Sequence, residues 1–227
     1  RLRRSKISNF KIKKLQNIIF KISLVPSVSF MGISGALSMK NCDIADDMDI
    51  FIIAKQNLVW FTRLILVILL IFMKAYRNKN AKDVKNKVCL NFIIGDNTLG
   101  FSKNKQNMYI AHEIAQLVPV FDKNNTYKDF INSNKWILQF LPNSLERINN
   151  YKIRFTKKEN PIERMIIKIL LFIKVEKIAK YFQIIYMKND ITKEEIKDNF
   201  LAFHPFDYKR KVLSLYSDKL NNINHLK

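Results

Sequence analysis

Apolar residues recur along the chain in two alternating patterns, which predict strands and helices in turn. Short runs rich in β-branched and aromatic side chains, typical of buried strands, occupy residues 28–33, 47–53 and 87–94. Apolar residues at helical spacing predict helices over residues 9–24, 58–76 and 108–117. The alternation predicts an α/β (α+β) fold in which helices cover a small mixed sheet.

The last third of the chain has only the helical pattern. We predict one long helix over residues 161–188, a shorter helix starting at a Thr192–Glu195 capping box, and a last helix near Val212. Pro119 is predicted to break the chain before a short helix that begins near Thr126. The expected organisation is a sheet domain with an N-terminal helix over residues 1–142, a linker over residues 143–160 and a helical region over residues 161–227.

Clustered carboxylates at the start of the second strand are the clearest sign of chemistry. The run Asp46-Asp47-Met48-Asp49 leads directly into Ile50-Phe51-Ile52-Ile53. Because side chains alternate along a strand, Asp47 and Asp49 are expected on one face, roughly 7 Å apart along the backbone. Two carboxylates placed in this way can hold a pair of divalent cations roughly 3.5–4 Å apart, and such ions can grip a triphosphate.

Small residues precede these acids. Ser34-Gly35-Ala36 follows the first strand and is predicted to turn into a brief helix over residues 37–41. Free backbone N–H groups at such a turn suit a phosphate group, so Ser34, Gly35 and Ala36 are candidate nucleotide-binding residues. Arg63, one turn inside the next helix, is a further candidate for binding phosphate.

Composition adds charge to this picture. The 227 residues include 40 Lys and Arg against 19 Asp and Glu, for a formal net charge of +21. Such a balance favours nucleic acid or another anionic partner, although a composition rich in Asn, Ile and Lys is also expected of an AT-rich genome. The apolar run at residues 64–73 has about ten residues, and a bilayer requires about twenty, so no membrane span is predicted.

The two cysteines and three histidines do not have the spacing of a zinc site. Cys42 and Cys89 lie far apart in predicted core elements, where reduced thiols act as small hydrophobic residues. With no recognisable signal peptide, a cytoplasmic location is expected.

The small-residue turn followed by Asp-x-Asp in an apolar strand resembles the signature of the DNA polymerase β-like nucleotidyltransferase superfamily. In that superfamily Gly-Ser usually occupies the turn, and here Gly35-Ala36 stands in its place after Ser34. A branch of bacterial nucleotidyltransferase-domain proteins is similar over more of the chain, in the segments NLVWFTRL, KVCLNFII, YIAHEIAQLVP and FHPFDYKRKVL. The resemblance implies a nucleotidyltransferase-type sheet and a C-terminal helical region that shapes an acceptor site.

One departure from the superfamily concerns the third carboxylate, which usually comes from a later central strand. The matching strand carries no acid, and Asn91 takes the expected inward position. An amide oxygen can ligate Mg²⁺, but it cannot accept a proton as a general base. Asp46, Asp43 or Asp96 is an alternative for the third group.

The resemblance implies a metal-dependent nucleotidyltransferase that moves a nucleoside monophosphate from an NTP to an acceptor. Asp47 and Asp49 would be catalytic and would hold Mg²⁺ or Mn²⁺, with Asn91 as a further ligand. The acceptor, whether small molecule, protein or RNA, stays open. The alternative is a catalytically inactive relative, a basic module that binds RNA or another anionic partner.

Overall fold

The computed structural model describes residues 1–78, 81, 83–187, 195–202, 212–216 and 218–219. Its centre is a seven-stranded mixed sheet with the strand order β5-β4-β1-β2-β3-β7-β6. The strands are β1 (Val28–Ile33), β2 (Met48–Ala54), β3 (Val88–Gly95), β4 (Val118–Lys123), β5 (Phe155–Lys157), β6 (Glu195–Lys197) and β7 (Phe200–Ala202). The central strand β2 runs antiparallel to β1 and parallel to β3.

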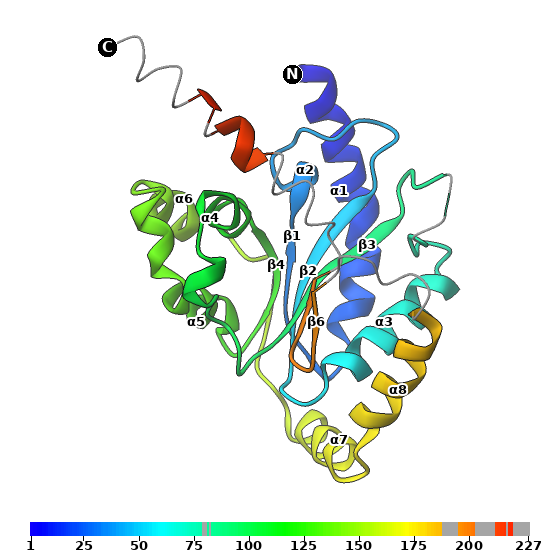
Figure 1. Cartoon of the computed structure of the whole chain (residues 1–227). Helices are drawn as coiled ribbons and strands as arrows, with labels where there is room; N and C mark the ends of the chain where they lie inside the picture. The colour runs from blue at the N-terminus through cyan, green and yellow to red at the C-terminus, as the bar shows by residue number, and fades with distance from the viewer. Residues whose placement is uncertain (79–80, 82, 188–194, 203–211, 217, 220–227) are drawn as a thin grey trace.

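Helices cover both faces of this sheet (Figure 1). The α-helices are α1 (Leu2–Ser23), α2 (Gly35–Ser38), α3 (Val59–Phe72), α4 (Met108–Ala115), α5 (Thr126–Ser133), α6 (Ser144–Asn149), α7 (Pro161–Phe172) and α8 (Val175–Met187), with short 3-10 helices η1 (Lys103–Lys105) and η2 (Lys135–Gln139). Helices α1, α3 and α8 pack over one apolar cluster and α4 to α6 over a second. The predicted α/β class, with a helix-covered mixed sheet and a C-terminal helical region, is confirmed.

The three predicted strands are present within a residue or two of their expected bounds. Almost every residue of β1, β2 and β3 is buried, which explains why they read as continuous apolar runs. Alternation sends Met48, Ile50 and Ile52 into the first cluster, while Phe51 and Ile53 face the second. Asp49 therefore points from the sheet towards the α4 side.

Strand β4 corrects the expectation that Pro119 breaks the chain. Pro119 lies inside this strand, where it is paired with Gly32 of β1 next to a register shift. A proline has no N–H to donate, and irregular pairing of this kind is where a sheet accepts one. The segment predicted as a linker contains α6 and β5, and β5 pairs with β4. Where a domain boundary falls stays a prediction.

The expected long helix over residues 161–188 is two helices. Ile173 and Lys174 separate α7 from α8, and Lys174 has a positive φ of 54°. The break lets Glu176 accept hydrogen bonds from the N–H groups of Trp60 and Phe61 at the start of α3, each at 2.9 Å. Tertiary contact thus overrides a pattern that is helical throughout.

The expected helix starting at a Thr192–Glu195 capping box is wrong from Glu195 onward, because Glu195 begins strand β6. Strand β7 follows and pairs with β3, so this part of the C-terminal region extends the sheet. Thr192 and the segment from Phe203 to Arg210 lie outside the described residues. No helix among those described is long and apolar enough to cross a membrane.

Candidate functional site

The two predicted acids meet at one end of the sheet, where β2 begins. Asp47 immediately precedes β2, and Asp49 is its second residue. Lys11 of α1 is buried and donates hydrogen bonds to the carbonyl oxygens of Ile44 and Asp46, which fixes the loop that delivers the acids. In the parallel register Asp49 lies beside Cys89 of β3.

The side chains of Asp47, Asp49 and Cys89 form one cluster. Their potential ligand atoms all lie within 4.8 Å of one another. The thiol of Cys89 hydrogen-bonds to the Asp49 carboxylate. Burial, and after it the Asp49 carboxylate, raises the pKa of Cys89 to about 12, so at neutral pH the thiol acts as a donor. We call Asp47, Asp49, Cys89 and the neighbouring Arg77 the acidic site.

Gly35 brings backbone directly against this site. Its φ is +61°, in the left-handed region that glycine accepts most readily. A Cβ atom at this position would lie 2.5 Å from Asp49 Oδ2, closer than any real side chain could come. The Ser34 N–H donates to the Asp49 carbonyl oxygen at 3.0 Å, so the turn is fastened to β2. A side chain here would have to displace the Asp49 carboxylate and hold a positive φ, so glycine is favoured at this position. The role of Gly35 in binding a nucleotide stays a prediction.

Arg77 gives the site a built-in positive charge. Its Nη1 lies 2.8 Å from Asp47 Oδ2 and also donates to Cys89 Sγ at 3.3 Å. The ion pair is partly solvated, since the side chains of Arg77 and Asp47 are 35% and 17% exposed. One of the two carboxylates is thus already neutralised before any ligand binds.

Asp49 has no such partner. Burial, together with the nearby Asp47 carboxylate, raises its pKa to about 7. Among the described residues, Asp49 Oδ1, Ser34 Oγ and both polar atoms of Asn91 are buried without a hydrogen-bond partner. Unpaired buried polar groups are costly. Others lie elsewhere in the described part of the chain, such as Ser29 Oγ and Tyr127 OH, so only those beside Asp49 bear on this site.

Glu113 adds a third carboxylate from α4. It lines a small pocket together with Ser34 and the rings of Phe51, Phe92 and Phe101. Burial raises its pKa to about 7, and its charge acts in turn on Asp49. The pocket therefore joins the small-residue turn to a carboxyl group that can take up or release a proton near neutral pH.

The other residues named from sequence lie in varied settings. Ala36 is exposed on α2. Asn91 is fully buried at a register shift between β2 and β3, and its role as a metal ligand stays a prediction. Arg63 is nearly buried on α3 and donates to Gln183 of α8. Asp96 follows the far end of β3, roughly 20 Å from Cys89 at strand spacing, so it is excluded as the third acid.

Sequence reasoning missed Cys89, Arg77 and Glu113 as members of the site. Cys89 could have been found by placing the strands side by side, because it lies two residues before Asn91 and opposite Asp49. Arg77 and Glu113 come from a loop and a helix whose positions depend on tertiary packing. No local pattern identifies them.

The oxygen donors of the site fit a hard divalent cation. Mg²⁺ is commonly held by one or two carboxylates and completes its shell with water and substrate phosphates. Asp49 Oδ1 is a buried oxygen with no partner, which a cation would satisfy. Cys89 is a poor ligand for Mg²⁺ because the ion prefers oxygen. Asp47 and Asp49 are thus the residues that would hold Mg²⁺ or Mn²⁺.

Comparisons with protein-family models, with curated proteins and with solved structures find no match to this chain. Fold and site define it as a mixed α/β protein with a carboxylate cluster at the end of its central strands.

Proposed function

We propose that this protein is a metal-dependent nucleotidyltransferase, which transfers a nucleoside monophosphate from an NTP to an acceptor and releases pyrophosphate. The observation that carries the proposal is the approach of Gly35 to Asp49. Backbone without a side chain lies directly against a carboxylate with an unpartnered oxygen. The resemblance of this turn and of the Asp-x-Asp strand to the polymerase β-like superfamily supports the same assignment.

Each group of the site has a role in this proposal. Asp47 and Asp49 hold the cation, and Ser34 with Gly35 faces the phosphates of the NTP. When bound, the metal supplies positive charge that stabilises the phosphoryl oxygens and the departing pyrophosphate. Arg77 already neutralises Asp47, so the acidic site requires less added charge than two free carboxylates would.

Glu113 is the group we assign to proton transfer. The acceptor hydroxyl attacks the α-phosphorus, the bond to pyrophosphate breaks, and the hydroxyl proton passes to the Glu113 carboxylate. A pKa of about 7 suits a general base at neutral pH. Glu113 thereby replaces the carboxylate that the superfamily usually takes from a strand, where this chain has Cys89 and Asn91.

The test is a thermal-shift panel of the four NTPs with and without Mg²⁺ or Mn²⁺, followed by turnover assays. Ligands that bind only the folded protein raise its melting temperature. We expect Asp47→Asn and Asp49→Asn to abolish the metal-dependent shift and turnover while the protein stays folded. Asp129→Asn, an exposed acid on α5, is the matched control. Turnover that is unchanged in both site variants would refute the proposal.

A basic binding module is the second candidate. It is favoured by Arg77, which occupies Asp47, and by the net charge of +21. This candidate predicts binding of RNA that weakens steeply with salt, because counterions are released on binding. Such binding, combined with no metal-dependent binding of any NTP, would favour the module over the enzyme.

A further inference from the structure

Helices α7 and α8 expose the apolar stripe that an amphipathic helix normally buries. On α7 and its C-cap Ile173, the exposed apolar residues recur at helical spacing: Ile162, Met165, Ile166, Ile169, Phe172 and Ile173. On α8 the same spacing gives Ile178, Tyr181, Phe182 and Ile185, and Tyr186 adjoins them. We call these two stripes the α7–α8 apolar surface.

The contacts that fix these helices use other, narrower faces. On α7 the buried residues are Glu163 and Ile167, and on α8 they are Ala179, Gln183 and Met187. Gln183 bonds the Trp60 carbonyl oxygen and Arg63, so α8 is anchored to α3 through polar contacts. The apolar stripes contribute little to this attachment. Exposed apolar stripes of this kind mark an interaction site.

The exposed charges within α7 and α8 are positive, and the exposed Asp198 beside them is paired with Lys180 of α8. The only acids within α7 and α8 are Glu163 and Glu176, and both are turned inward, to Lys157 and to the N-terminus of α3 respectively. Lys168, Lys174 and Lys177 are exposed beside the apolar residues. A second copy of the chain would bring like charges together, since each copy carries +21. An anionic surface is complementary.

We propose that the α7–α8 apolar surface binds the headgroup layer of an anionic lipid bilayer. Amphipathic helices with Lys or Arg next to Phe, Leu or other large apolar residues lie in that layer without crossing it. Phe172 and Ile173, 86% and 54% exposed, lie at the turn between the two helices and are followed by Lys174. Helix α7 and this turn form the lower end of the molecule in Figure 1, where a flat surface can reach them.

Flotation of the full chain with vesicles tests this proposal. We expect it to float with vesicles of equal parts phosphatidylcholine and phosphatidylglycerol but not with phosphatidylcholine alone. A chain of charge +21 can adhere to anionic lipid through charge alone, so the decisive variant removes apolar side chains and leaves the net charge unchanged. We expect Phe172→Ser with Ile173→Ser to weaken partitioning into the vesicles by about tenfold or more. Phe10→Ser, which removes a 64% exposed aromatic residue on α1, is the matched control and should float like the wild type.

Two results would overturn the proposal. The first is equal flotation of the double variant and the wild type, which would mean that general charge explains adhesion. The second is absence of flotation together with a dimer in sedimentation velocity that the double variant abolishes, which would assign the surface to a second copy. Both variants change exposed side chains, so circular dichroism should show an unchanged fold.

Discussion

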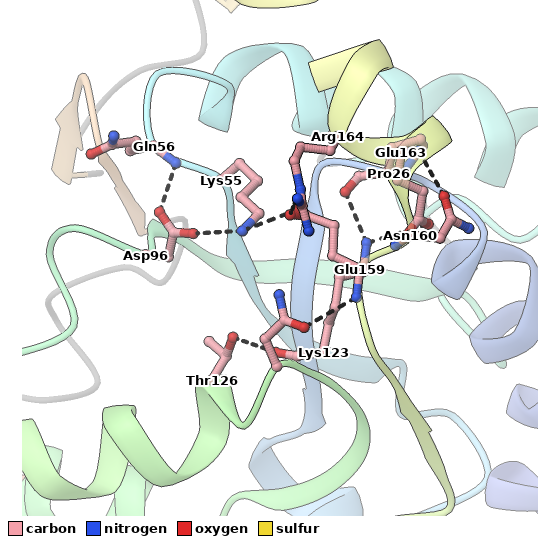
Figure 2. Close-up of polar contacts among 11 residues, drawn as sticks. Pro26, Lys55, Gln56, Asp96, Lys123, Thr126, Glu159, Asn160, Glu163 and Arg164 are labelled. Carbon is pink, nitrogen blue, oxygen red and sulfur yellow. Dashed lines mark hydrogen bonds and ion pairs between the residues drawn. The ribbon is translucent and has the colours of Figure 1, made fainter. Parts of the chain in front are cut away.

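Two polar clusters lie at opposite ends of the same sheet. One contains a carboxylate without an ion-pair partner, and in the other each charge is paired. At the start of β2, the acidic site leaves Asp49 without a cation and with an unpartnered oxygen. At the far end, we call a group of six paired charges the ion network: Lys123, Glu163, Lys157, Glu159, Lys55 and Asp96. Figure 2 labels all of them except Lys157. In the network each charge has an opposite charge beside it.

The ion network joins β4, β5 and α7. Lys123 is fully buried, donates to the Pro26 carbonyl oxygen at 2.9 Å and lies 3.5 Å from Glu163. Glu163 also receives Lys157 at 2.8 Å and completes a capping box with Asn160 at the start of α7. Such a set of paired and bonded charges holds the first helix of the C-terminal region on the sheet.

The pKa values separate the two clusters. Burial would raise the pKa of Glu163, but Lys157 and Lys123 hold it below its usual value. Burial raises that of Asp49 to about 7, and Asp47 adds to the effect. A structural carboxylate is thus stabilised in its charged form, whereas Asp49 is poised to gain from a cation that the protein itself does not supply. This contrast is what supports a ligand at the acidic site.

The largest expected effect is at the ion network. Glu163→Ala leaves Lys123 buried without its nearest counter-charge. It also removes the reciprocal bond of the α7 capping box, from the Asn160 N–H to the Glu163 carboxylate. We therefore expect a loss of roughly 3–5 kcal/mol in the free energy of unfolding. Urea denaturation followed by circular dichroism measures it. Glu146→Ala, an exposed acid in the first turn of α6, is the control and should cost less than about 1 kcal/mol. Equal losses in the free energy of unfolding of the two variants would mean that the ion network has no special role in stabilising the fold.

The opposite sign is expected at the acidic site. Asp49 has a pKa of 3.8 when unfolded and about 7 when folded, so between these values the folded chain holds a proton that the unfolded chain has lost. Stability through this group therefore falls as pH rises towards 7 and is level above it. Asp49→Asn removes this cost, and we expect it to raise the free energy of unfolding by roughly 1–3 kcal/mol at about pH 8, since solvent contact reduces the full conversion.

The same urea experiment at about pH 4 is the internal control, because the carboxyl is then mostly neutral in the folded state and costs little. The gain from Asp49→Asn should shrink there. A variant that is less stable than the wild type at both pH values would mean that Asp49 is a structural acid like Glu163, and the contrast between the clusters would be lost.

Sequence identified the central strands because they are buried on both faces, where only apolar residues fit. Prediction from sequence failed where pairing with a neighbouring strand decides the structure of a segment. Pro119 gives a local signal against a strand, yet β1 accepts it beside a register shift, and Glu195 belongs to a helix-start pattern although its segment pairs with β7. The helix break at Lys174 has no glycine or proline that would predict it from sequence.

The same division holds at the site. Alternation within one strand was enough to place Asp47 and Asp49 together, and a turn of small residues was enough to select Gly35. Cys89 required the register between two strands, and Glu113 required the packing of α4 on the sheet. Local spacing therefore predicts the acids themselves, while the groups that set their charge are fixed by tertiary structure.

The smallest expected effect concerns the turn that approaches Asp49. Gly35→Ala places a Cβ atom 2.5 Å from Asp49 Oδ2 and imposes a positive φ on alanine. We expect a loss of about 1 kcal/mol in the free energy of unfolding and, if the site binds an NTP, loss of the metal-dependent thermal shift.

A double-mutant cycle separates the two causes of that loss. In an Asp49→Ala background the crowding oxygen is gone, so Gly35→Ala should cost only the backbone strain of its positive φ, and the coupling between the two positions should be at least about 0.5 kcal/mol. Additive losses would mean that the turn at Gly35 and the Asp49 carboxylate are not energetically coupled. The assignment of the acidic site depends on the close approach of Gly35 to Asp49, and that support would then be lost. The acidic site would differ from the ion network only because fewer of its charges are paired.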